Sequence, residues 1–63
     1  MKFYDFISMY DDYYGKIVVN DNNLKQIFAG YIYDAGLGRT DLHNLKVVSF
    51  GFYDGELTVR LDV

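Results

Sequence analysis

The chain has 63 residues and a net charge of −3, with 51% hydrophobic and 24% charged residues. This length allows one domain with one small core, and the composition lies far from that of disordered chains. The chain contains no Cys, which excludes disulfides and thiolate metal sites, and its six Lys and Arg residues are scattered, which disfavours direct binding to nucleic acid.

The hydrophobic residues form no run long enough to span a membrane, and Met1-Lys2 leads into mixed polar and aromatic residues instead of an apolar signal core. We therefore expect a soluble, cytoplasmic protein that does not bind membranes. Seven Tyr and five Phe residues are large and stiff enough to dominate a core or an interface.

Residues 3–12 are predicted to form a helix. Their apolar side chains recur with the i, i+3, i+4, i+7 spacing of one helical face: Phe3, Phe6, Ile7 and Tyr10. Gly15 is a suitable stop signal. The short β-branched run of residues 16–19 then ends in a turn cluster at residues 20–23, and this pattern predicts a strand.

Residues 24–34 fit two structures. A helical face is matched by the spacing of Leu24, Ile27, Phe28, Tyr31, Ile32 and Ala35. Against a helix, Gly30 would lie in its middle at a cost of about 1 kcal/mol relative to Ala, and the segment is rich in strand formers. We favour a strand that pairs with residues 16–19; the alternative is a second helix at residues 23–35 over a three-stranded sheet. A polar connection at residues 34–44 follows, with one helical turn beginning at Thr40.

The last seventeen residues predict a β-hairpin. Asp54-Gly55 is a preferred type I′ turn pair, and a two-residue turn sets the register of the flanking strands. The register places these pairs opposite each other on one buried face: Phe52 and Leu57, Phe50 and Val59, Val48 and Leu61. The other face is half apolar and half charged, and its first strand carries Leu45, Val47, Ser49, Gly51 and Tyr53.

These elements predict an α+β fold, in which one N-terminal helix packs on a small antiparallel sheet of two β-hairpins within a single domain at residues 1–63. The expected core combines two sets of side chains: Phe3, Phe6, Ile7 and Tyr10 from the helix, and Val48, Phe50, Phe52, Leu57, Val59 and Leu61 from the last hairpin.

No arrangement of residues supports catalysis. His43 is the only histidine, so a histidine metal cluster cannot form within the chain. Ser8 falls on the first helix, and Ser49 falls on the outward face of the hairpin, opposite Arg60 in a solvated cross-strand contact. The Gly-rich stretch at residues 36–40 lacks the third Gly and the Lys of a phosphate-binding loop. Residues 21–25 lack the Gly and the distal Glu of a calcium loop. We therefore expect no enzyme activity, no cofactor and no metal.

A cluster of Tyr and Asp residues near the N-terminus is a candidate protein-binding patch. Together with one residue of the last hairpin, the candidate residues are Tyr4, Asp11, Asp12, Tyr13, Tyr14 and Tyr53. Tyr is favoured at interfaces, and spaced carboxylates can imitate phosphates toward a basic cleft. Core Tyr residues with solvated Asp residues would explain the same pattern, so both interpretations stay open.

Several segments resemble small proteins of phages and mobile elements of Gram-positive bacteria. They are a Phe-Ile helix, an Ile-Val-Val-Asn-Asp strand, a hydrophobic segment with a central Gly, a Leu-containing turn, and the hairpin Val-Ser-Phe-Gly-Phe-Tyr-Asp-Gly-Glu-Leu-Thr-Val. The resemblance covers most of the chain and implies no residue roles.

From composition and resemblance we expect a non-enzymatic protein-binding module. Within that class we expect an inhibitor of a bacterial nucleic-acid-processing defence protein, similar to anti-CRISPR proteins, that blocks a basic surface of its partner. The alternative is a small assembly subunit that forms homo-oligomers through its sheet. An assembly subunit would self-associate on its own, whereas an inhibitor need not. As a separate prediction, we expect a homodimer formed through a sheet edge or through the face with Leu45, Val47 and Tyr53.

Overall fold

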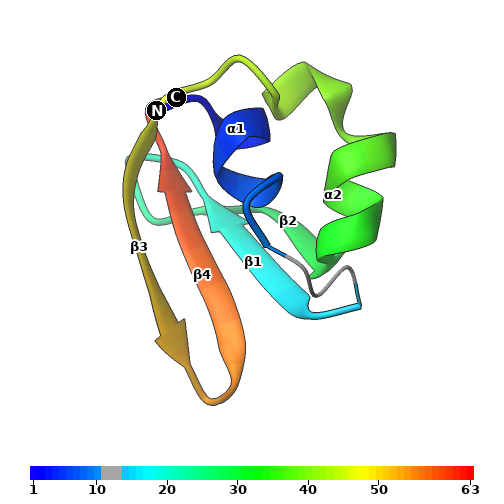
Figure 1. The fold of residues 1–63 in the computed structure, drawn as a ribbon. Coiled ribbons are helices and arrows are strands. Elements are labelled where there is room, and N and C mark those ends of the chain that lie inside the picture. Colours follow the sequence, from blue (N-terminus) through cyan, green and yellow to red (C-terminus); the bar gives the residue numbers. More distant parts are fainter. Residues whose placement is uncertain (11–13) are drawn as a thin grey trace.

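A computed structural model describes residues 1–10 and 14–63, and within them helices lie on one face of a four-stranded sheet (Figure 1). The elements are α1 (Phe3–Ile7), β1 (Lys16–Asn20), β2 (Gln26–Tyr31), α2 (Ile32–Gly38), a 3-10 turn η1 (Thr40–Leu42), β3 (Val47–Tyr53) and β4 (Glu56–Leu61). The α+β class, the N-terminal helix and both hairpins are confirmed. No helix in the described residues is long and apolar enough to cross a membrane.

The sheet is mixed, where we expected it to be antiparallel. Its strand order is β2-β1-β4-β3, with antiparallel hairpins β1–β2 and β3–β4 joined by a parallel pairing of β1 with β4. The parallel register puts Ile17 beside Leu57 and Val19 beside Val59. These four side chains are fully buried beneath the helices. The two strands that carry fully buried side chains, β1 and β4, therefore occupy the centre, and β2 and β3 form the edges.

The last hairpin forms with its predicted turn. Asp54 and Gly55 have φ values of 53° and 79°, as a type I′ turn requires. Phe52 pairs with Leu57 and Phe50 with Val59, which confirms the register near the turn.

Farther from the turn the predicted register is wrong. A bulge shifts it between Val47 and Ser49, so that Val47, and not Val48, lies opposite Leu61. A bulge inserts one extra residue into a strand and reverses the alternation beyond it. Val47 and Leu45 consequently pack against the core, and they do not share an exposed face with Tyr53, as we had expected.

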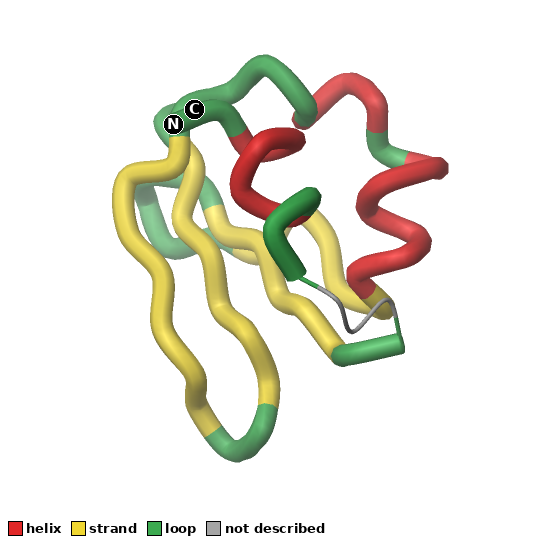
Figure 2. The backbone as a smooth tube through the Cα atoms, in the orientation of Figure 1, coloured by secondary structure: helices red, strands yellow, loops and turns green. Residues whose placement is uncertain are grey.

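The core differs from the prediction at the edge strand. Phe3, Phe6, Ile7, Leu57, Val59 and Leu61 are buried as expected, and Ile17, Val19, Ile32, Ala35 and Leu42 join them. Tyr10 is half-buried. However, Val48, Phe50 and Phe52 are 43%, 61% and 63% exposed. Phe50 and Phe52 are exposed because the end of β3 and the hairpin turn extend beyond the helical layer (Figure 2). Val48 is exposed because the bulge places Val47 toward the core in its stead.

The first helix is shorter than the predicted span of residues 3–12. Helix α1 ends at Ile7, and the Ser8 hydroxyl donates a hydrogen bond to the Tyr4 carbonyl at 2.6 Å. Met9 and Tyr10 donate backbone hydrogen bonds to Phe6 and Ile7, three residues back, which tightens the chain into a turn.

The ambiguous segment contains both predicted structures in succession. Its strand β2 pairs with β1 as favoured, and helix α2 begins directly after Tyr31, which is still extended at φ −97° and ψ 151°. The expected polar connection at residues 34–44 is therefore wrong in its first half, where α2 packs Ile32 and Ala35 into the core. The predicted helical turn at Thr40 is present as η1.

Candidate protein-binding surfaces

Edge strand β3 exposes two aromatic side chains, Phe50 and Phe52, on the face of the sheet that carries the helices, and the Tyr10 ring lies beside them. We call these three residues the aromatic edge. The three rings form a continuous series through the buried Phe6. The Phe6 ring lies 4.7 Å from that of Phe50 and 5.4 Å from that of Tyr10, and the Tyr10 and Phe52 rings lie 6.3 Å apart. One side of the series is anchored in the core, while the Phe50 and Phe52 rings remain largely exposed.

The backbone of the same two residues faces the free edge of the sheet. In a hairpin closed by a two-residue type I′ turn, the flanking residues, here Tyr53 and Glu56, form a hydrogen-bonded pair, and such pairs alternate along the ladder. Phe52 and Phe50 therefore occupy the intervening positions, where N–H and C=O point away from β4. Aromatic side chains and unpaired backbone groups thus coincide at these two residues.

The N-terminal segment limits this free edge on one side. Lys2 pairs with Lys46 in an isolated antiparallel bridge, and the Val47 N–H donates to the Met1 carbonyl at 2.8 Å. The turn at Asp54-Gly55 limits it on the other side. Among residues 1–10 and 14–63, nothing pairs with the outer edge of β3 from Val48 to Tyr53, and this stretch contains no Pro or Lys to discourage strand pairing.

At the opposite edge, β2, the Arg39 side chain forms a hydrogen bond with a backbone carbonyl. Ile27 has no partner in the β1–β2 register, and its carbonyl accepts a hydrogen bond from Nη1 of Arg39 at 2.9 Å. The Arg39 guanidinium lies 5.8 Å from the Phe28 ring centre and is held by both oxygens of Asp41 at 2.9 and 3.0 Å. This hydrogen-bonded contact raises the pKa of Arg39 and lowers the pKa of Asp41. Edge β2 is therefore partly capped, in contrast to β3.

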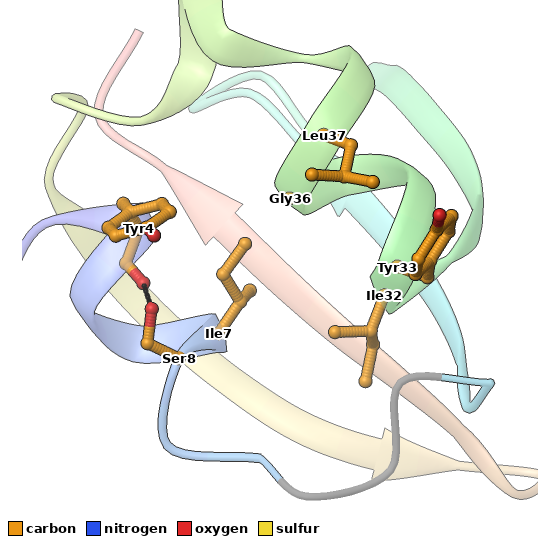
Figure 3. A pocket seen from close by; sticks show the side chains of 7 residues that line it. All are labelled: Tyr4, Ile7, Ser8, Ile32, Tyr33, Gly36 and Leu37. Atoms are coloured by element: carbon orange, nitrogen blue, oxygen red, sulfur yellow. Dashed lines mark hydrogen bonds between the residues drawn. The ribbon is translucent and has the colours of Figure 1, made fainter.

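A second candidate surface is a groove of about 300 Å³ between α1 and α2 (Figure 3). It is lined by Tyr4, Ile7, Ser8, Ile32, Tyr33, Gly36 and Leu37. Its one aliphatic hydroxyl, that of Ser8, is already engaged with the Tyr4 carbonyl. Small-molecule sites usually add several convergent polar groups to an apolar lining. The groove therefore suits one apolar side chain of a protein better than a polar metabolite.

The predicted Tyr and Asp patch is only partly described by the structure. Asp11, Asp12 and Tyr13 lie outside the described residues. Tyr4 packs against the His43 ring at 4.7 Å and borders the groove, and Tyr14 stacks on Tyr33 at 6.4 Å. Tyr53 lies on the opposite face of the sheet from the helices, where its ring closely approaches Gly51. Tyr4 and Tyr14 are thus associated with the helical layer, and Tyr53 is not.

The remaining polar candidates have structural roles in this geometry. His43 is half-buried, with Nε2 3.3 Å from the Ala35 carbonyl. Ser49 is exposed on β3, opposite Arg60. One oxygen of Asp21 accepts hydrogen bonds from the backbone N–H groups of Asn23 and Lys25 at 2.8 and 2.9 Å, as in an Asx-stabilised turn.

Comparison with known proteins gives no relatives. No family model, curated protein or solved structure matches the chain.

Proposed function

We propose that this chain is a non-enzymatic protein-binding module whose edge strand β3 receives an extended strand of a protein partner. One observation carries the proposal: Phe50 and Phe52 expose about three fifths of their surface on the edge strand, at the positions where the register directs backbone groups outward. Strand addition uses both features, because the main chain supplies hydrogen bonds and alternate side chains supply specificity.

The shape of the aromatic edge supports this mode of binding. Phe50 and Phe52 are two residues apart and point to the same face, so an added strand would place alternate side chains against them. The rings are supported from behind by Phe6 and Tyr10, which limits the conformational freedom lost on binding. Binding surfaces commonly depend on a few such aromatic anchors.

The more specific expectation, an inhibitor of a bacterial nucleic-acid-processing protein, stays a prediction. It is supported by the resemblance to phage and mobile-element proteins and by the net charge of −3. Its acidic contacts, Asp11 and Asp12, lie outside the described residues. The edge of β3 therefore supports the general proposal independently of any acidic patch.

Site-specific photo-crosslinking in bacterial lysate tests the proposal. Phe50 or Phe52 is replaced by the photoreactive residue p-benzoylphenylalanine, with Leu37 as the matched control because it is 67% exposed and lies in the groove. We expect cross-links to a protein from positions 50 and 52, competed by excess unlabelled chain and absent at position 37. Cross-links from position 37 alone would instead assign binding to the groove, and labelling that excess chain does not reduce would contradict a specific site.

A further inference from the structure

Resting on the proposed function, we infer that the strand received by β3 is β3 of a second copy of this chain. The two copies pair antiparallel about a two-fold axis at Gly51. Val48 lies at the bulge and Asp54 in the turn, so the regularly paired part of β3 runs from Ser49 to Tyr53, and Gly51 is its midpoint. If the axis lay at another residue, part of this stretch would stay unpaired, or the partner's strand would collide with the N-terminal segment at Lys46 and Val47 or with the turn.

This register makes the aromatic edge complementary to itself. It places Phe50 opposite the partner's Phe52, and Phe52 opposite the partner's Phe50. Their outward-facing backbone groups form hydrogen-bonded pairs, and their rings meet on the helical side of the sheet. Cross-strand aromatic pairs stabilise antiparallel sheets. At the axis, Gly51 lies opposite Gly51, so no side chains collide where the two strands are closest.

The charges at the ends of the stretch favour the same arrangement. Lys2 and Lys46 are exposed and lie opposite each other in the bridge, and like charges in this arrangement repel. The other end of β3 carries Asp54 and Glu56 at the turn. Antiparallel pairing brings Asp54 opposite the partner's Val48, which is two residues, or roughly 7 Å along the strand, from the partner's Lys46. Each acidic turn therefore lies near a basic pair of the other copy.

The second edge of the sheet does not offer an equivalent surface. On β2, Arg39 already occupies the Ile27 carbonyl and covers the Phe28 ring. Pairing through β3 alone gives a closed dimer with an eight-stranded sheet and both helical layers on one face. The contact is short compared with the roughly 800 Å² per partner of a standard stable interface, so the dimer should dissociate on dilution.

Cysteine cross-linking tests the register, since the natural chain has no Cys. Two single variants, Ser49→Cys and Tyr53→Cys, are mixed under mild oxidation. In the inferred dimer residue 49 lies opposite residue 53 of the partner, at a Cα separation of about 4.5 Å that a disulfide can span. Residue 49 of one copy lies roughly 14 Å along the strand from residue 49 of the other.

We expect the mixed disulfide to form at least tenfold faster than either homodimeric disulfide. Equal rates for the three species, or selective coupling of Ser49→Cys with itself, would overturn the register. Leu24→Cys, exposed on the β1–β2 turn, is the control for random collision.

Sedimentation velocity over a range of concentrations tests the dimer itself. We expect the wild-type chain and the control variant Leu24→Lys, which is altered at an exposed position outside both candidate surfaces, to dimerise with rising concentration. The double variant Phe50→Lys/Phe52→Lys should stay monomeric with an unchanged circular dichroism spectrum. A wild-type chain that remains monomeric throughout overturns the inference. If the chain is monomeric but positions 50 and 52 still cross-link to another protein, the proposed function stands, and only the inference that the partner is a second copy is wrong. Cross-linking that fails at both positions removes the proposed function as well.

Discussion

The Phe6 and Phe50 rings are in contact, but one is buried and the other is largely exposed, so their substitutions should differ in cost. Phe6 is 2% exposed, whereas Phe50 keeps its outer side in solvent. We expect Phe6→Ala to lower the free energy of unfolding by about 3–5 kcal/mol, as for other buried aromatic residues. Phe50→Ala loses one ring contact and a minor part of its burial, so about 1–2 kcal/mol is expected. Urea denaturation of dilute samples measures both, and equal losses would mean that Phe50 is buried in solution.

The same comparison shows what residue patterns can predict. Alternation from the Asp54-Gly55 turn predicted correctly that Phe50 and Phe52 share a face with Leu57 and Val59. It could not predict that this face is covered over β4 and open over β3, because coverage depends on which strand lies at the edge. Phe50 and Phe52 were therefore assigned to the core, although they form the candidate binding surface.

Among the residues that the structure describes, Asp41 has a carboxyl group whose titration should affect stability. Its pKa is lowered by the hydrogen bonds from Arg39, so the folded state favours the charged carboxylate. The stabilisation is therefore present above the unfolded-state pKa of about 3.9 and is lost as pH falls through the lower pKa of the folded state. We expect Asp41→Asn to reduce the acid sensitivity of unfolding between about pH 5 and pH 2. Urea titrations at several pH values test this, with Asp5→Asn on α1 as the control; an unchanged pH profile in Asp41→Asn would contradict the assignment.

At the scale of elements, the hairpin turn and the end of α2 place glycine in opposite situations. Gly55 has φ 79°, whereas nothing lies near Gly38 and its backbone is not left-handed. We expect Gly55→Ala to cost about 1–2 kcal/mol, because Ala is strained at positive φ. Gly38→Ala should be neutral or stabilising by up to about 1 kcal/mol, since Ala is the better helix former. Thermal unfolding separates the two, and a tolerated Gly55→Ala would argue against the type I′ turn.

Two element boundaries in this chain could not be predicted from one hydrophobic periodicity: the change from strand to helix at Ile32, and the bulge at Val48. Residues 24–34 carry a helical spacing, but β2 uses the first part of it and α2 begins at Ile32. Helix α2 then packs Ile32 and Ala35 inward, so part of the helical pattern was real. At Val48 a single bulged residue reverses the alternation, and no turn residue marks the bulge in the sequence.

At the scale of the whole molecule, the arrangement of the two hairpins was beyond local pattern. Each hairpin follows from its own turn, but the parallel pairing of β1 with β4 follows from long-range burial of Ile17, Val19, Leu57 and Val59. That pairing decides which strands become edges. It therefore leaves β3 at a free edge. Because this pairing is long-range, the sequence pattern predicts the fold class but not which side chains form the exposed surface.

A chain this short has a small stability margin, so self-association should be visible in its unfolding. Dimerisation stabilises the folded state by mass action, and about 1 kcal/mol shifts the midpoint of a domain of this size by several degrees. We expect a hundredfold rise in wild-type concentration to raise Tm by about 5 °C. The Tm of Phe50→Lys/Phe52→Lys should not change with concentration. It should lie several degrees below the dilute wild-type value, because each substitution also removes a ring contact within the chain. Scanning calorimetry at high protein concentration and fluorescence on dilute samples together cover the hundredfold concentration range. A concentration-independent wild-type Tm would mean that β3 meets no second copy under these conditions.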